Sequence, residues 1–128
     1  FIYTIFVYII YYIVSILLYF LPKFKAIQKQ RREILKNALL QNTKGKDVIW
    51  LHSASVGELD QSKALIAVIK RKNPEIFILQ SVFSASVTEK QLIDPLIDAY
   101  FYLPFDIPSL YKPILKKFKP KKLIILAW

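Results

Sequence analysis

The sequence has no cysteine and no methionine, only one histidine (His52) and only two glycines (Gly45 and Gly57). Without cysteine the chain can form no disulfide, thiolate zinc site or iron–sulfur cluster, and it has no cysteine nucleophile. One histidine excludes a two-histidine metal site within the chain. Two glycines exclude the G-x-G-x-x-G and P-loop motifs that hold nucleotide phosphates. These absences remove several redox, metal and nucleotide-binding classes from consideration.

Charged residues are also absent from one part of the chain. Residues 1–22 carry none, residues 23–46 carry eight Lys or Arg against one acid (Glu33), and residues 47–128 carry eleven basic and eight acidic residues. The chain has 128 residues, 55% of them hydrophobic, and a formal net charge of +10. Its hydrophobic residues and its excess positive charge are therefore unevenly distributed along the sequence. We interpret the three segments as a membrane anchor helix (1–22), a basic juxtamembrane segment (23–46) and a globular domain (47–128).

The uncharged segment has the length of a membrane-spanning helix. As a helix, its 22 residues would extend roughly 33 Å, against a hydrocarbon core of about 30 Å. A signal peptide is the main alternative, but its apolar run would be shorter and no small-residue cleavage site lies near Pro22. A helix buried in the core of the domain is a second alternative. The segment predicts a transmembrane or deeply embedded helix.

The basic segment predicts an orientation for that helix. By the positive-inside rule, cations this close to an apolar span lie on the cytoplasmic side, which places the globular part in the cytoplasm. Residues 24–40 are predicted to form a helix, and its cations either fix this topology or bind an anionic membrane surface directly. Nucleic acid is a weaker partner, because the cations adjoin an anchor and lack an aromatic stacking platform.

From residue 47 onwards the pattern is that of alternating strands and helices. We predict strands at 48–52, 76–82, 99–103 and 122–127, and helices at 59–72, 87–97 and 108–118. This alternation predicts an α/β fold, a Rossmann-like parallel sheet. Ligands of such sheets bind at the loops that follow the strands, here 53–57, 83–86 and 104–107.

Two of these loops contain a serine followed three residues later by a glutamate, Ser55 with Glu58 and Ser86 with Glu89. This spacing is that of a capping box, in which the pair stabilises a helix start. A carboxylate at this edge of the sheet is also placed to take a proton from a hydroxyl group, and N–H groups there can bind an anion. For Glu58 both interpretations stay open. His52, at a strand end, is either a structural histidine or a ligand contact.

Three short motifs resemble one known family. Residues 50–58 read WLHSASVGE, residues 102–108 read YLPFDIP and residues 118–121 read FKPK before an apolar strand. Together with the apolar and basic N-terminal segments, they resemble the bacterial 3-deoxy-D-manno-octulosonic acid (Kdo) transferases of lipopolysaccharide synthesis. The resemblance covers nearly the whole chain, and the first two motifs, about 50 residues apart, are fairly specific together.

The resemblance implies the N-terminal, acceptor-side half of a GT-B glycosyltransferase at the bacterial inner membrane. Such an enzyme transfers Kdo from CMP-Kdo to a lipid A precursor with inversion, and needs neither a metal nor another cofactor. The resemblance assigns Glu58 as the general base, with Ser53, Ser55 and Gly57 shaping the acceptor pocket. We add the hydroxyls of the second loop, Ser84 and Ser86, to the predicted substrate-binding residues.

The chain also departs from the family pattern. Residues 84–89 read SASVTE where the family often has T-P-T-G-S-E, and Ala127 stands where many members have a glutamate. The donor-binding domain is missing from this sequence, so we expect the chain alone to be an inactive front part of a longer enzyme. A membrane-tethered α/β binding domain without catalysis is the alternative function.

Overall fold

The computed structural model of the protein describes residues 2–19, 22–104 and 108–126. At its centre, four parallel strands form one sheet in the order β3-β2-β1-β4: β1 (Val48–Ser53), β2 (Phe77–Val82), β3 (Ala99–Tyr102) and β4 (Lys122–Leu126). Trp50 in β1 pairs with Leu79 in β2 and Leu123 in β4. The predicted α/β class with a parallel sheet is confirmed, and the strand order is that of the first four strands of a Rossmann sheet.

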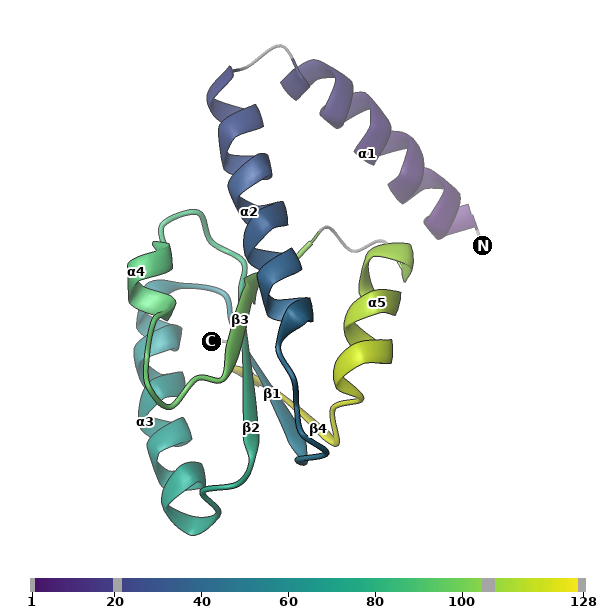
Figure 1. Ribbon diagram of the computed structural model, residues 1–128. Coiled ribbons are helices and arrows are strands. Elements are labelled where there is room, and N and C mark those ends of the chain that lie inside the picture. The colour runs from purple at the N-terminus through teal and green to yellow at the C-terminus, as the bar shows by residue number, and fades with distance from the viewer. Residues whose placement is uncertain (1, 20–21, 105–107, 127–128) are drawn as a thin grey trace.

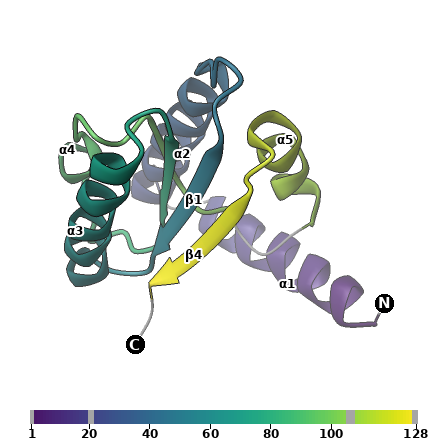
Figure 2. The ribbon, with the colours of Figure 1, turned by 90° about the horizontal axis from the view of Figure 1, so that it is seen from below.

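Helices cover both faces of the sheet (Figures 1 and 2). One face carries α3 (Val56–Lys72), and the other carries α2 (Pro22–Leu40) and α5 (Pro108–Phe118). The short α4 (Glu89–Leu92) lies beside the edge strand β3, where Leu92 joins the same core cluster as Ile34 of α2. Because both faces are covered, the inner strands are apolar without alternation. Every residue of β2 is buried.

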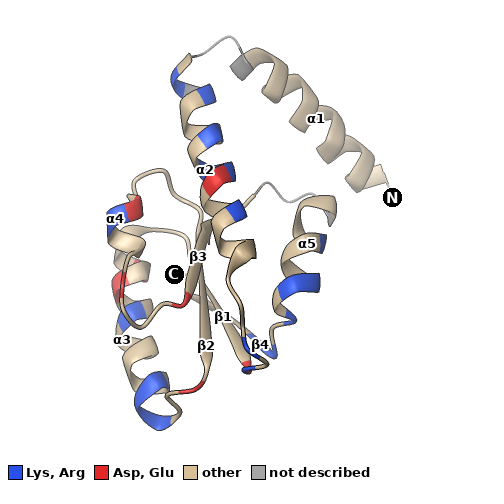
Figure 3. Cartoon of the chain, viewed as in Figure 1, with Lys and Arg blue, Asp and Glu red and all other residues tan. Residues whose placement is uncertain are grey.

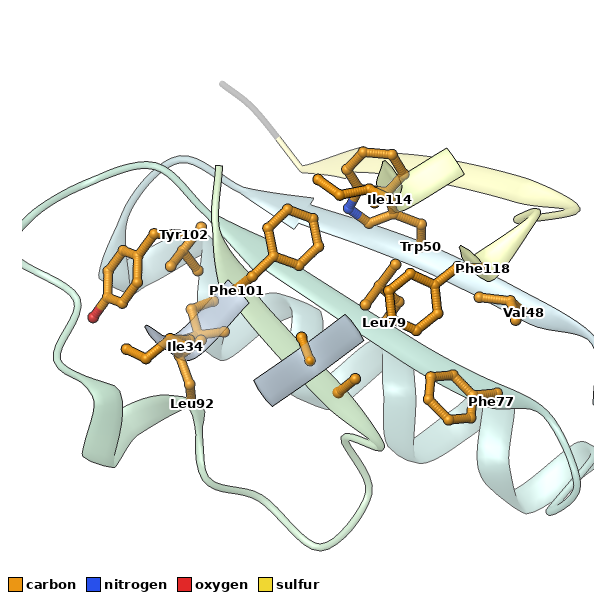
Figure 4. Packing of buried hydrophobic residues seen from close by; sticks show 14 of the residues in the cluster. Ile34, Val48, Trp50, Phe77, Leu79, Leu92, Phe101, Tyr102, Ile114 and Phe118 are labelled. Atoms are coloured by element: carbon orange, nitrogen blue, oxygen red, sulfur yellow. The ribbon is translucent and has the colours of Figure 1, made fainter. Parts of the chain in front are cut away.

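The main core lies between the sheet and the two helices α2 and α5 (Figure 4). The rings of Trp50 in β1 and Phe101 in β3 lie 5.7 Å apart, and those of Phe77 and Phe118 lie 5.9 Å apart. The two helices add four buried side chains: Ile34, Ala38, Ile114 and Phe118. Each large apolar side chain buried in this way stabilises the fold by about 1.5–3 kcal/mol. The second half of the basic helix α2 is therefore docked on the sheet.

The transmembrane part of the predicted fold is wrong. Within the described ranges, no helix combines the length and the apolar character that crossing a bilayer requires. In place of one helix over 1–22, α1 covers Ile2–Tyr19 and α2 starts at Pro22. The prediction of a cytoplasmic domain depended on a spanning helix and loses that basis.

Helix α1 packs with one side against the rest of the protein. Its half-buried residues recur at helical spacing: Thr4, Val7, Tyr8, Tyr11 and Ser15. The hydroxyl of Tyr8 lies 3.4 Å from Oγ of Ser109 at the start of α5. The remaining side exposes large apolar side chains, among them Ile2, Ile5, Phe6, Ile9, Ile13 and Ile16. Two of the tyrosines in the middle of the segment, Tyr8 and Tyr11, thus face the protein.

The predicted helix over 87–97 is also wrong, since α4 covers only Glu89–Leu92. Ile93 is already extended, with φ −73° and ψ 105°. Pro95 disfavours helical geometry at Asp94, the residue before it. The Asp94 carboxylate instead accepts a hydrogen bond from the backbone N–H of Leu96 at 2.9 Å and closes a turn. The remaining helices and strands lie within a few residues of their predicted positions.

Candidate functional site

The topology of the sheet places a ligand-binding edge between β1 and β4. The chain runs from β1 through α3 to β2 and through α4 to β3, and then crosses to the other side of β1 through α5. The connections through α3 and α4 therefore add strands on one side of β1, and the connection through α5 adds β4 on its other side. The loops at the carboxyl ends of the two strands diverge at such a switch point, and open parallel sheets bind ligands there. The loop after β1 carries Glu58.

Glu58 forms the predicted capping box with Ser55. The N-cap Ser55 has extended backbone, and its Oγ accepts from the backbone N–H of Glu58 at 3.4 Å. Oε2 of Glu58 accepts from the backbone N–H groups of Ala54 at 2.5 Å and Ser55 at 2.9 Å. Both N–H groups hold the same oxygen at the N-terminus of α3. The cap thus holds Glu58 in one orientation.

The second carboxylate oxygen of Glu58 is open to a ligand. Glu58 is only 7% exposed, yet Oε1 has no hydrogen-bond partner within the ranges that the structure describes. In those ranges no side-chain oxygen or nitrogen is both buried and without a partner. Oε1 must therefore reach solvent. Glu58 can be both a helix cap and a proton acceptor, because the cap uses Oε2 and leaves Oε1 without a partner among the described residues.

The other predicted residues of the first loop differ in their exposure. Ser53 is fully buried, and its Oγ accepts from Nε2 of Gln80 at 3.1 Å. Ser55 is half-buried at the helix start, and Gly57 is exposed. Of these three residues, Ser53 faces the interior, whereas Ser55 and Gly57 lie at the rim of the site.

Backbone hydrogen bonds bring the second loop to the first. The N–H of Phe83 donates to the carbonyl of Ser53 at 3.3 Å, and the N–H of Ser84 donates to the carbonyl of Ala54 at 3.1 Å. The hydroxyls of Ser84 and Ser86 lie 2.7 Å apart. The structure therefore gathers the predicted residues of both loops at the same edge.

The second predicted capping box is wrong. Helix α4 is capped by Thr88, whose box partner is Gln91. The hydroxyl and backbone N–H of Thr88 both donate to Oε1 of Gln91, at 2.9 and 2.8 Å. Ser86 bonds instead within its own loop, and its N–H donates to Oγ of Ser84 at 3.1 Å. Glu89 accepts from the hydroxyl of Tyr100 at 3.2 Å.

Sequence reasoning missed a buried polar chain beneath the loops. Oγ of Ser62 in α3 donates to Oε1 of Gln80 at 2.5 Å, and Nε2 of Gln80 donates to Ser53 and to the carbonyl of Ser81. Ser53, Ser62, Gln80 and Ser81 are all fully buried. The signal in the sequence was Gln80, which with Ser81 interrupts the apolar residues of β2.

Arg31 of α2 was missed as well. Its guanidinium donates to the carbonyl of Phe83 at 3.2 Å and lies 4.8 Å from the centre of the Tyr102 ring. Burial lowers the pKa of Arg31, and the nearby Tyr102 opposes that shift. The sequence placed Arg31 in a run of cations and offered no signal that it differs from its neighbours.

Several predictions fall outside the described residues. The third loop is described only at Pro104, whose carbonyl accepts from the hydroxyl of Tyr111 at 3.1 Å. Residues 105–107 of the second motif and Ala127 lie outside the described ranges. In the parts that are described, no three residues among His, Cys, Asp and Glu lie close enough together to hold a metal ion. The expectation of metal-independent chemistry stays a prediction.

A surface hollow of about 650 Å³ lies at the opposite, amino-terminal edge of the sheet. Its lining includes lysines from the end of α5 and from the loops before β1 and β4, among them Lys46, Lys117 and Lys121. Lys121 is paired with Asp47 at 2.7 Å, and Lys46 with Glu75 at 3.3 Å. This hollow is remote from Glu58 and does not belong to the candidate site.

The fold and the site together define a class: a Rossmann-like α/β domain with an oriented carboxylate at its switch point. The sequence profile of the family described as 3-Deoxy-D-manno-octulosonic-acid transferase (kdotransferase) matches residues 25–128. The chain belongs to this family. It is also 29% identical over 79 residues to the 3-deoxy-D-manno-octulosonic acid transferase of Chlamydia muridarum (strain MoPn / Nigg).

The match to the Chlamydia protein is partial. It covers 60% of this chain, and the chain spans only 18% of the length of that relative. No solved structure matches the chain. The comparisons thus support the family resemblance seen in the sequence motifs.

Proposed function

We propose that this chain forms the acceptor-side part of an inverting glycosyltransferase that transfers Kdo from CMP-Kdo to a lipid A precursor. Family membership supports the transferase class. The observation that carries the mechanism is the carboxylate of Glu58, which is bound through Oε2 and open at Oε1. A carboxylate held in this way has one oxygen for orientation and one for proton transfer.

In this mechanism Glu58 acts as the general base. Its carboxylate takes the proton of the attacking acceptor hydroxyl, whose oxygen forms a bond to the anomeric carbon of Kdo. The bond from that carbon to the phosphate of CMP breaks, and CMP leaves with the electron pair. Attack from the face opposite the leaving group inverts the configuration, and a single base is enough because the phosphate is already a good leaving group.

The neighbouring residues have distinct parts in this proposal. Ser55 and Gly57 line the acceptor side of the loop, and Ser84 and Ser86 present hydroxyls from the second loop. Ser53 acts from the interior, because its side chain holds the end of β1 against Gln80. We infer that it supports the pocket without touching the acceptor.

The donor belongs to another part of the enzyme in this proposal. GT-B enzymes bind the nucleotide sugar in a second domain, and we place CMP-Kdo there. The reaction as written involves no metal ion and no further cofactor, because the charge on the leaving phosphate is stabilised from the donor side.

We also propose that the protein binds the surface of the bacterial inner membrane. Helix α1 exposes a broad apolar surface, and the exposed part of α2 carries cations but few acids (Figure 3). An apolar helix of this length can lie in the plane of the interface, with cations beside anionic head groups. This arrangement would bring a lipid-linked acceptor to the edge that carries Glu58.

The substitution Glu58→Gln tests the mechanism in the full-length gene product. Glutamine keeps an acceptor oxygen for the N–H groups of Ala54 and Ser55, so the cap and the melting temperature should be preserved. It cannot accept a proton, and we expect kcat for transfer of Kdo to a lipid A precursor to fall by about 10²–10⁴-fold. Asp60→Asn, an exposed change in the same helix, is the matched control.

A Glu58→Gln enzyme with a near wild-type rate would show that Glu58 is only a helix cap. Substitution of Ser55 by Ala is the complementary test, because it weakens helix capping and keeps the carboxylate of Glu58. It removes the N-cap side chain and should cost about 1 kcal/mol of stability while leaving the base in place.

A further inference from the structure

A chain of hydrogen bonds ends at His52, the residue before the last of β1. The Nε1–H of Trp50 donates to Oγ of Ser81 at 2.8 Å, and the same oxygen lies 2.9 Å from Nδ1 of His52. Trp50 and Ser81 are buried, whereas His52 is half-buried. The three side chains lie on one face of the sheet, and Ser81 pairs with His52 across the two strands.

The direction of these hydrogen bonds follows from which of the three side chains can donate and which can accept. An indole N–H only donates, so Oγ of Ser81 is the acceptor for Trp50. The hydroxyl proton of Ser81 is then directed to Nδ1 of His52, its other hydrogen-bond partner. A neutral ring that accepts at Nδ1 carries its proton on Nε2. The ring is also hydrogen-bonded to the backbone of Ser81. The opposite tautomer would leave the buried hydroxyl of Ser81 without an acceptor among the described residues.

His52 lies near the carboxyl end of β1, the strand whose following loop carries Glu58. Within the described ranges Nε2 has no hydrogen-bond partner, and none of the side-chain nitrogens there is both buried and unpartnered, so Nε2 is accessible. His52 lies at the switch point, paired with Ser81 on one side and Ile125 on the other. Its ring is close enough to the Glu58 carboxylate for the two to interact electrostatically.

We propose that His52 is an acceptor-binding residue, a neutral Nε2–H donor to an oxygen atom of the acceptor, and that Trp50 and Ser81 are positioning residues that set its tautomer. The proposal rests on the proposed function, since it names a contact of the same acceptor. A neutral donor suits this place, because it binds a hydroxyl or phosphate oxygen without forming an ion pair with the base. The buried tryptophan and serine keep water from competing for Nδ1.

The tautomer can be measured without any enzymatic activity. His52 is the sole histidine of the 128 residues, so a long-range ¹H–¹⁵N spectrum of the labelled chain at pH 7.5 shows a single imidazole, and His52→Gln removes it. We expect a protonated Nε2 and an unprotonated Nδ1. In Ser81→Ala and in Trp50→Phe, which keeps the ring packing, the population of the Nδ1–H form should rise. A wild-type ring protonated at Nδ1, or a population unchanged in both variants, would overturn the proposal.

The contact with the acceptor is tested in the full-length gene product by titration with a lipid A precursor in the absence of CMP-Kdo. His52→Asn, which lacks a donor at the Nε2 position, should weaken binding by about tenfold, the value of one hydrogen bond. His52→Gln restores a donor near that position and should recover part of the loss. Equal affinity of both variants and wild type would overturn the contact. Because Glu58→Gln should change turnover and not this affinity, a failure of the proposed base is distinguishable from a failure at His52.

Discussion

The guanidinium of Arg31 donates to the carbonyl of Phe83 at 3.2 Å and so connects the basic helix α2 to the loop that follows β2. The same group lies over the ring of Tyr102, and the Tyr102 hydroxyl in turn donates to the carbonyl of Val87. These contacts enclose the loop that presents Ser84 and Ser86. A helix that we propose to contact the membrane is thus bonded directly to a loop of the proposed acceptor site.

Arg31→Lys should loosen this loop. Lysine keeps the charge but cannot stack a planar group on Tyr102 and donate to Phe83 at the same time. We expect a loss of about 1 kcal/mol in the free energy of unfolding, measured by urea denaturation. Arg32→Lys, at the exposed neighbouring position, is the control and should change stability by less than about 0.5 kcal/mol. Equal effects of the two substitutions would show that Arg31 is an ordinary surface cation.

The buried chain through Gln80 should be a strong determinant of stability. In Gln80→Ala the hydroxyl of Ser62 loses its acceptor and a cavity opens beneath the first loop, so we expect a loss of about 2–4 kcal/mol. The double variant Gln80→Leu with Ser62→Ala fills the space and removes the unpaired hydroxyl, and it should be more stable than Gln80→Ala. Gln41→Ala, at an exposed position, is the control. A loss in Gln80→Ala no larger than that in Gln41→Ala would contradict a role of this buried chain in stability.

The stability of the protein should depend on pH through His52. Burial lowers the pKa of His52 below its ordinary value of 6.5, while the backbone of Ser81 and the carboxylate of Glu58 oppose the shift. The unfolded chain therefore binds a proton at higher pH than the folded chain does. The contribution of the neutral His52 ring to the free energy of unfolding is fully present above about pH 6.5. It is lost as the pH falls from there through the pKa of His52 in the folded protein.

The measurement is the urea midpoint between pH 5 and pH 8 for wild type and His52→Gln. Wild type should lose more stability than the variant over the acid half of this range. The effect should be small, because the ring is half-exposed and partly screened by solvent. Parallel curves would mean that His52 has the same pKa in the folded and unfolded states.

Binding to anionic vesicles should depend on the exposed cations of α2. Replacing Lys29, Arg32 and Lys36 by Ala should lower the partition coefficient on phosphatidylglycerol vesicles by about 10–100-fold, since each cation near the surface contributes up to about 1 kcal/mol. The same number of exposed charges removed from the far end of the molecule, at Arg71, Lys72 and Lys117, is the matched control (Figure 3). Equal losses in both triple variants would indicate a general charge effect, and binding to neutral vesicles isolates the part due to α1.

Local features of this protein could be read from the sequence. The capping box of Ser55 and Glu58 joins residues three apart, so its geometry depends on little beyond the start of one helix. The four strands are short apolar runs between turn residues, and α5 follows from the spacing of Ile114 and Phe118. The motif around Glu58 also indicated the family to which the chain belongs.

Helix boundaries were harder to predict, because neighbouring signals compete. An apolar run over 1–22 predicted one spanning helix, but the structure has α1 ending at Tyr19 and a second helix starting at Pro22. Around α4, the sequence predicted a capping box of Ser86 with Glu89, whereas Thr88 and Gln91 form the box in the structure. Local pattern does not fix such boundaries, since helix ends fray and shift by one or two residues.

The sequence by itself determined the strand–helix order and the cap that orients Glu58, because each depends on residues close together in the chain. The tertiary structure decided which side chains support and surround that carboxylate. Ser53 meets Gln80 across 27 residues, His52 meets Ser81 across 29, and Arg31 meets Phe83 across 52. Contacts at such separations exist only once the strands pair and the helices dock, because burial of the core then holds these groups within hydrogen-bond distance.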